Sequence, residues 1–320
     1  MAAQVTLAMI EAAAERIGPH IRKTPIIEMA HVRDRPVPNP VFIKLESLQV
    51  TGAFKARGAT NRLLTADPQT LKNGIVTASG GNHGTAVARA GQMAGLPVTV
   101  YLPPTASPAK IEAIAGWGAT VEVTGDTWDD ADEAAVAHAK ASGAVYFHPF
   151  KDADVVAGQG TVALEMAEAV PQADVYVIAV GGGGLIAGFS AVLAERNPKA
   201  RIIGVEPEGS PTLARSLEAG RVVGLDRVTT RVATMACGRT SEMIFDLVSD
   251  RVERVVLVRD DDMTEAARWI RDELAIRADL SAAASFAALR LGRVPLDPGE
   301  TVCTLICGAD DSALETEAGP

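Results

Sequence analysis

Four consecutive glycines, Gly181 to Gly184, stand in the middle of the chain in the segment GGGGLIAG (181–188). They directly follow the apolar run DVYVIAV (174–180), which predicts a buried strand, and they open an apolar helical pattern. Glycine turns tightly, and the free N–H groups at a helix N-terminus attract anions. A plain strand–helix turn rarely needs four glycines, so we interpret the segment as a phosphate site. The spacing matches neither the dinucleotide fingerprint nor a P-loop, which favours a smaller phosphate ester.

A lysine, Lys55, follows a Thr-Gly turn and one aromatic residue in the segment SLQVTGAFKARGA (47–59). An isolated lysine is usually a solvated surface charge. Close to a phosphate site, a lysine could instead form a Schiff base with the ligand. An amine whose pKa is lowered by burial or by nearby positive charge forms Schiff bases readily.

Two further segments place polar residues where predicted strands end. In TASGGNHGTAVARAG (77–91), paired glycines, Asn82 and His83 precede a small-residue helix whose first N–H groups could bind a carboxylate. An N-cap would explain Asn82 alone, but not the glycines and the histidine together. In TLICGADDS (304–312), Cys307 ends an apolar strand, and the commonest role of such a cysteine is that of a buried structural thiol.

The elements that position these residues alternate between short apolar β-branched runs and longer helical patterns. We predict strands at 41–46, 74–79, 97–102, 119–124, 174–180, 200–206, 254–258 and 301–307. Helices are predicted at 56–65, 83–94, 108–115, 128–142, 155–169, 185–195, 261–275 and 282–291, with an amphipathic helix at the N-terminus. This alternation is typical of α/β proteins with parallel sheets. Because 320 residues exceed the usual size of one core, we expect a small domain at 51–150 and a large one from 1–50 and 151–320.

Composition excludes several classes of partner. The formal net charge of -10, with acidic residues spread along the chain, argues against a nucleic-acid or anionic-membrane surface. The three cysteines form no even disulfide framework and lack companions at zinc spacing. Glu11 and Glu15 interrupt the N-terminal apolar run, which disfavours a signal peptide. We therefore expect a cytoplasmic protein.

Together, SLQVTGAFKARGA, SGGNHG, GGGGLIAG and the late CGAD resemble the motifs of the tryptophan-synthase-β class (fold type II) of pyridoxal-phosphate-dependent enzymes. They are most similar to the serine/threonine dehydratase (threonine ammonia-lyase) and serine racemase family. IRKTPI (21–26) and HPFKDADVVAGQGT (148–161) extend the resemblance from about residue 20 to residue 312. The resemblance implies a two-domain, three-layer αβα fold with open, mostly parallel twisted sheets, a pyridoxal 5′-phosphate cofactor, an amino-acid substrate and a homodimer.

The resemblance also implies roles, position by position. Lys55 would hold the cofactor as a Schiff base and move the Cα proton of the substrate. Phe54 would pack beside the cofactor, Asn82 would bind its 3′ oxygen and Cys307 would face its pyridine nitrogen. Backbone N–H groups would hold the phosphate at Gly181, Gly182, Gly183, Gly184 and Leu185. The substrate carboxylate would be bound by Ser79, Gly80, Gly81, Asn82 and His83.

The reaction that the resemblance implies is β-elimination from a small β-hydroxy amino acid, such as threonine or serine, to a 2-oxo acid and ammonia. A thiol at Cys307 would leave the pyridine nitrogen without a carboxylate partner, which favours prompt elimination over transamination. Racemases of this family carry a serine where this chain has Gly80, so we expect poor racemisation. Cysteine-synthase relatives carry a Thr-Ser-Gly-Asn-Thr-Gly type of loop, which makes β-replacement less expected.

Other departures leave the preferred substrate open. The family's divalent-cation site would fall on Glu206, Ser210 and Thr212, where an aspartate is usual at the last position, so a Mg²⁺ or Ca²⁺ site is weakened. Asp279 replaces the usual glutamate, and RVATMACGR (231–239) departs from the common Asp-Gly-Leu-Ala form. A racemase, a β-replacement synthase and a non-catalytic protein that binds a phosphate ligand are the alternatives.

Overall fold

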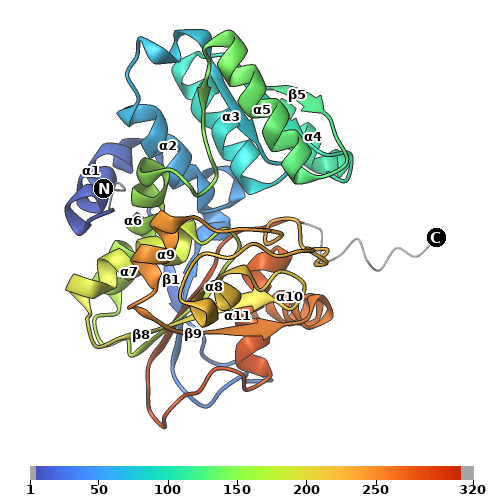
Figure 1. The fold of residues 1–320 in the computed structure, drawn as a ribbon. Helices are drawn as coiled ribbons and strands as arrows, with labels where there is room; N and C mark the ends of the chain where they lie inside the picture. Colours follow the sequence, from blue (N-terminus) through green and yellow to red (C-terminus); the bar gives the residue numbers. More distant parts are fainter. Residues whose placement is uncertain (1–4, 311–320) are drawn as a thin grey trace.

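The structure, a computed structural model, describes residues 5–310 and contains two β-sheets (Figure 1). The larger sheet has the order β1-β2-β10-β7-β8-β9, and all its neighbours are parallel except β1 and β2. The smaller sheet has the order β5-β4-β3-β6 and is parallel throughout. The predicted α/β class with mostly parallel sheets is confirmed. The strands are Ile26–Glu28 (β1), Val41–Leu45 (β2), Ile75–Ala78 (β3), Val98–Leu102 (β4), Thr120–Val123 (β5), Val145–Tyr146 (β6), Val175–Ala179 (β7), Arg201–Pro207 (β8), Val252–Val258 (β9) and Val302–Ile306 (β10).

Three helices cover the small sheet. They are α3 (Asn82–Ala94), α4 (Pro108–Ala115) and α5 (Trp128–Ser142). Both α3 and α4 connect strands in the direction from β3 towards β5, whereas α5 returns from β5 to β6 on the other side of β3. Because crossovers between parallel strands are right-handed, α3 and α4 lie on one face of this sheet and α5 on the other.

The large sheet is covered according to the same rule. Helix α7 (Gly184–Arg196) connects β7 to β8, and α8 (Thr212–Ala219) and α9 (Glu242–Val248) lie between β8 and β9. Helices α10 (Asp260–Leu274) and α11 (Leu280–Arg290) return from β9 to β10 in the opposite direction, and therefore lie on the opposite face. Burial on both faces explains the unbroken apolar strands: Val175 to Ile178 are all fully buried.

A row of helices joins the two sheets. Helix α2 (Lys55–Thr65) packs on α3 and on α6 (Ala153–Ala169), and α6 packs in turn on α7 and on α1 (Leu7–Ile17) (Figure 1). Short 3-10 turns occupy Gly18–His20, Glu46–Leu48, Val50–Gly52 and Thr70–Asn73. The row places α6 between the helix that begins at Lys55 and the helix that begins at the glycine segment.

Glycines allow the helices of this row to touch closely. A β-carbon built on Gly158 of α6 would lie 2.7 Å from the Cα atom of Gly58 on α2. A β-carbon built on Gly188 of α7 would lie 2.7 Å from the Cα atom of Gly160 on α6. Atoms packed at the density of a protein interior do not tolerate such overlap. The separations of α2 and α7 from α6 are therefore fixed by the absence of side chains at these contacts.

The predicted elements are found with shifts of at most two residues at their ends, and the N-terminal helix is present as α1. Elements that the sequence analysis missed are β1, β6, α8 and α9. The strands of the small sheet lie between residues 75 and 146, and those of the large sheet lie outside that range. The domain division at residues 51 and 150 stays a prediction. Across residues 5–310, no helix combines the length and apolarity that a membrane crossing requires.

Candidate active site

The four motifs meet in one cavity of about 780 Å³. It lies at the carboxyl edges of both sheets, because the chain enters its wall directly after β3 of the small sheet and directly after β7 and β10 of the large sheet. Such an edge is where open parallel sheets bind ligands. The lining includes every residue predicted to bind the cofactor or substrate: Phe54, Lys55, Ser79, Gly80, Gly81, Asn82, His83, Gly181, Gly182, Gly183, Gly184, Leu185 and Cys307.

Lys55 is the first residue of α2, and its amine lies inside the protein rather than in water. The Nζ atom donates a hydrogen bond to the carbonyl oxygen of Pro149 at 3.0 Å and lies 5.3 Å from the ring centre of Phe54. No carboxylate pairs with it among residues 5–310. Burial disfavours the charged ammonium and lowers the pKa of Lys55 to about 8. About a fifth of this amine is therefore neutral, and nucleophilic, at pH 7.4, compared with about a thousandth for an ordinary lysine.

Main-chain contacts bring Lys55 next to the end of β10. The Phe54 N–H donates to the carbonyl oxygen of Cys307 at 3.0 Å, and the Ala309 N–H donates to the carbonyl oxygen of Gly52 at 2.9 Å. The turn before this contact contains Thr51 at φ 67° and Gly52 at φ 74°. A β-branched residue at positive φ is strained, and such strain is common at functional sites. The chain is thus forced to enter α2 beside Cys307.

The glycine segment forms a turn that ends at the start of α7. Gly183, at φ +93°, is the N-cap, and no side chain caps the helix. The first N–H groups of α7 are therefore left to bind a ligand. Packing also requires these glycines: a β-carbon on Gly182 would overlap the ring of Phe150, and one on Gly183 would lie 2.5 Å from Ile244. Glycine at these positions therefore allows close packing and also leaves backbone N–H groups free to bind an anion.

A second helix N-terminus opens into the same cavity. Gly81 is the N-cap of α3 and contributes no side-chain cap, whereas Asn82 is the first helical residue and not the cap. The cavity therefore has two helix N-termini without a side-chain cap: α3, which packs on the small sheet, and α7, which packs on the large sheet. Each favours a negatively charged group, because the helix dipole places partial positive charge at its N-terminus. A ligand with two anionic groups, such as a phosphate and a carboxylate, matches this pair.

The imidazole of His83 is buried and neutral. Its Nε2 atom lies 3.1 Å from the carbonyl oxygen of Phe147, which can only accept, so Nε2 carries the proton. Burial lowers the pKa of His83 to about 3, and the nearby Lys55 amine acts in the same direction. The unprotonated Nδ1 atom cannot donate to a carboxylate. The predicted contact between His83 and the substrate carboxylate would therefore use its backbone N–H group.

A buried polar chain connects Asn82 to Cys307. The Asn82 side-chain amide donates to Asp279 Oδ2 at 2.8 Å, and Ser281 donates to Asp279 Oδ1 at 2.6 Å. The Ser281 hydroxyl lies 3.7 Å from the Cys307 sulfur. Burial raises the pKa of the Cys307 thiol, which stays protonated. Since Ser281 uses its proton on Asp279, it can accept from this thiol.

The sequence analysis missed Ser281 as a cavity residue. The wall also contains Gly224, Leu225, Thr230 and parts of 231–239, and of these the sequence singles out only 231–239, as a departure from the family pattern. Most of these residues lie in irregular loops, where neither helical nor strand periodicity gives a signal. The position of Ser281, two residues after Asp279 on the N-terminal turn of α11, is the one signal that could have found it.

Glu206 lies outside the cavity lining, and its carboxylate is used by the protein itself. Both of its oxygens accept backbone N–H groups, from Leu213 at 2.8 Å and from Ala214 at 2.9 Å, at the start of α8. Ser210 and Thr212 both donate to the carbonyl oxygen of Cys237. Within residues 5–310, no three His, Cys, Asp or Glu side chains form a metal-binding group. This arrangement is that of a helix cap and fits a dedicated Mg²⁺ or Ca²⁺ site poorly.

Comparisons with known proteins agree on one family. The profile described as "Pyridoxal-phosphate dependent enzyme" matches residues 17–308. The chain belongs to this family. L-threonine ammonia-lyase of Geobacter sulfurreducens is 36% identical over 303 residues, which are 95% of this chain and 75% of that protein. Serine racemase of Arabidopsis thaliana is 32% identical over 280 residues, 88% of this chain and 84% of that protein.

Solved structures give the same result. Maize serine racemase matches with a TM-score of 0.90 at 28% identity, covering 99% of this chain and 97% of that chain. The processed form of threonine deaminase isoform 2 from Solanum lycopersicum matches with a TM-score of 0.89 at 30% identity, covering 97% and 85%. The expected family, the tryptophan-synthase-β-like fold and the dependence on pyridoxal phosphate are confirmed.

The residues of this pyridoxal-phosphate-dependent enzyme fit that cofactor. A buried amine without a carboxylate partner, Lys55, shares the cavity with the uncapped start of α7. The first could bond an aldehyde, and the second could bind a phosphate. Cys307 and Asn82 line the same space.

The lowered pKa of Lys55 predicts the pH dependence of cofactor attachment. Only the neutral amine attacks an aldehyde, so the rate at which apo-protein reacts with pyridoxal phosphate should rise with pH and level off above about pH 8. An ordinary lysine would level off only above about pH 10.4. Stopped-flow absorbance over this range measures the rate, and N-acetyl-lysine amide corrects for ionisation of the cofactor. A rate that still rises steeply at about pH 10 would contradict the assignment.

Proposed function

We propose that this chain is a pyridoxal-phosphate-dependent dehydratase, an ammonia-lyase. Its substrate would be a small L-β-hydroxy amino acid, such as threonine, serine or a relative. The reaction would remove water across Cα and Cβ, and hydrolysis of the released enamine would then give a 2-oxo acid and ammonia. The observation that carries the proposal is the cavity in which a buried, partly neutral lysine lies with two uncapped helix starts.

Each part of the cavity has a task in this reaction. The cofactor, when bound, supplies an electron sink for the charge that develops at Cα. The backbone N–H groups at the start of α3, after Gly81, would bind the substrate carboxylate and so orient the Cα–H bond. Lys55 would take the Cα proton, because its pKa near 8 makes it an effective base at neutral pH. The relatives named as threonine ammonia-lyase and threonine deaminase support this assignment.

The wall that contains Cys307 favours elimination over transamination. Cys307 and Ser281 form this wall, and the Cys307 thiol stays protonated because burial raises its pKa. A carboxylate on this wall would keep the pyridine nitrogen of the cofactor charged and would make the cofactor a stronger electron sink. A neutral thiol does not, so a β-hydroxyl would leave before a proton returns.

A racemase is the second candidate, because relatives with that name match this chain over most of its length. Racemisation needs a second proton carrier on the face of the cofactor opposite the lysine. The resemblance places that carrier at position 80, where this chain has glycine, which has no side chain to carry a proton. A β-carbon at Gly80 would lie 3.0 Å from the Ala106 side chain and 3.5 Å from that of Leu102, so a small residue fits with a slight shift.

Gly80→Ser tests this distinction. A serine hydroxyl would supply the missing proton carrier, so the ratio of racemisation to elimination on L-serine should increase by about tenfold or more. Gly80→Ala is the matched control, because it fills the same space without a hydroxyl. Chiral chromatography of serine and a pyruvate assay measure the two products. If both variants change the ratio equally, the absence of a hydroxyl is not what limits racemisation.

A substrate panel tests the reaction itself. L-serine, D-serine, L-threonine and larger β-hydroxy amino acids are incubated with the holoenzyme, with and without a chelator, and 2-oxo acid release is measured. At least one L-β-hydroxy amino acid should give a 2-oxo acid, and the chelator should leave the rate unchanged because Glu206 caps a helix. Accumulation of the opposite enantiomer without 2-oxo acid would instead establish a racemase. Product formation only with an added nucleophile would establish a β-replacement synthase.

The homodimer and the cytoplasmic location expected from the sequence are part of this proposal and stay predictions.

A further inference from the structure

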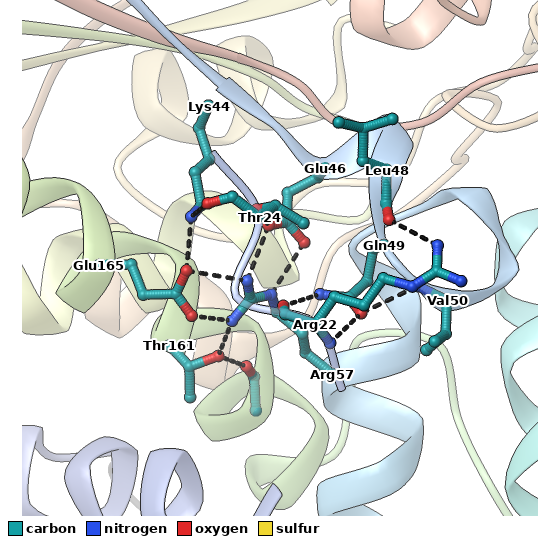
Figure 2. A network of polar contacts seen from close by, with 11 residues as sticks. Arg22, Thr24, Lys44, Glu46, Leu48, Gln49, Val50, Arg57, Thr161 and Glu165 are labelled. Atoms are coloured by element: carbon teal, nitrogen blue, oxygen red, sulfur yellow. Dashed lines mark hydrogen bonds and ion pairs between the residues drawn. The ribbon is translucent and has the colours of Figure 1, made fainter. Parts of the chain in front are cut away.

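Four charged side chains contact one another directly behind the start of α2 (Figure 2); three of them are buried and the fourth, Glu165, is 18% exposed. We call them the Arg57 cluster: Lys44 on β2, Glu46 just after β2, Arg57 on α2 and Glu165 on α6. Arg57 and Glu46 are 0% exposed and Lys44 is 1% exposed. None of the four lines the cavity. The cluster joins three separate segments of the chain, two residues away from Lys55.

The guanidinium of Arg57 uses all of its donors. Nε and Nη2 each donate to a different oxygen of Glu46 at 2.8 Å. Nη1 donates to Glu165 at 2.7 Å and to Thr161 at 3.1 Å, and Nη2 also donates to Glu165 at 3.2 Å. An arginine side chain has five N–H groups in one rigid plane. With five acceptors in fixed places, that plane has only one orientation.

The acceptors are themselves held from the other side. Lys44 donates to Glu165 at 2.5 Å and to the carbonyl oxygen of Thr24 at 2.6 Å. The Thr24 hydroxyl donates to Glu46 at 2.5 Å. Two cations therefore balance two anions, and Figure 2 shows them in one connected network. The Arg57 cluster is neutral as a whole and rigid.

Stability alone does not account for such a cluster. Burying Lys44, Glu46 and Arg57 is costly, because their charges leave water, and buried ion networks are often no more stabilising than well-packed apolar residues of similar volume. In the best-attested cases, buried ion networks fix how one element is aligned against its neighbours. Here the aligned element is α2, because Arg57 connects it to Glu46, just after β2, and to Glu165 on α6.

We propose that Arg57 is a positioning residue for Lys55. The contact between Gly58 and Gly158 fixes how far α2 stands from α6, but a contact between two glycines does not fix the rotation of α2 about its own axis. The planar guanidinium of Arg57 fixes this rotation, because only one rotation of α2 satisfies all five hydrogen bonds. A small rotation of α2 would swing the Lys55 amine away from the glycine segment, and a misplacement of about 1 Å can reduce a rate by about 10²-fold.

The test compares two ligands and does not depend on which reaction the loaded enzyme catalyses. Pyridoxal phosphate reports both the phosphate site and the covalent bond to Lys55. 4′-Deoxypyridoxine phosphate lacks the aldehyde and reports the phosphate site alone. A merely structural defect would weaken both ligands, whereas misplacement of Lys55 affects only the first.

Two variants disturb the Arg57 cluster without leaving an unpaired charge. Arg57→Lys keeps the charge and removes the planar guanidinium. Lys44→Met combined with Glu165→Gln removes one cation and one anion, and leaves the paired contact between Arg57 and Glu46. The matched control is Arg201→Lys, because Arg201 also bridges two glutamates, Glu253 and Glu300, but lies on β8 away from α2. Urea denaturation of each apo-protein establishes that it folds.

We expect both cluster variants to form the covalent bond to Lys55 about tenfold more slowly or worse. They should bind 4′-deoxypyridoxine phosphate as tightly as the parent, and Arg201→Lys should match the parent with both ligands. Unchanged bond formation in Arg57→Lys would overturn the proposal. An equal loss of both ligands would overturn it as well, because the cluster would then be holding the fold rather than aiming the lysine.

Discussion

The site depends on the packing of two helices against α6. One of them, α2, begins with Lys55, and the other, α7, begins at the glycine segment. Both touch α6 through glycine at a distance that no other residue permits, so the reach from Lys55 to the start of α7 is set by backbone contact. These contacts leave α2 free to rotate about its own axis, and we propose that the hydrogen bonds of the Arg57 cluster fix that rotation. A cofactor held at both ends needs this rigidity, because the start of α7 must contact its phosphate while Lys55 contacts its aldehyde.

Electrostatics in the cavity follow from burial and from helix ends rather than from paired charges. The two uncapped helix starts supply partial positive charge without any side chain. Lys55 and His83 both have lowered pKa values because burial disfavours their charged forms. Asp279 is buried behind the wall, and its oxygens accept hydrogen bonds from Asn82, from Ser281 and from the N–H group of Ala282 at the start of α11. The cavity therefore suits an anionic ligand while its lysine keeps the neutral form that chemistry requires.

Sequence predicted those parts of the structure that local patterns determine. The long strands and helices were found because both faces of the parallel sheets are buried, which makes the strands continuously apolar. The glycine segment, Lys55, Asn82 and Cys307 were found because each stands at the end of a predicted element. The two-residue strand β6 and the short helices α8 and α9 were missed because they are too short to show a period. The Arg57 cluster was missed for a different reason: its members are 121 residues apart at most, and ion pairs between distant segments leave no local pattern. The loop at 230–239, parts of which line the cavity, is irregular, so local sequence patterns do not predict its shape.

The central claim is that Lys55, and no other lysine, bonds the cofactor whose phosphate lies at the start of α7. Reduction of the holoenzyme with borohydride, followed by digestion and mass spectrometry, locates the pyridoxyl group directly. A single modified peptide, with the pyridoxyl group on Lys55, is the expected result. A pyridoxyl group on Lys151, which also lines the cavity, or on a surface lysine would contradict it.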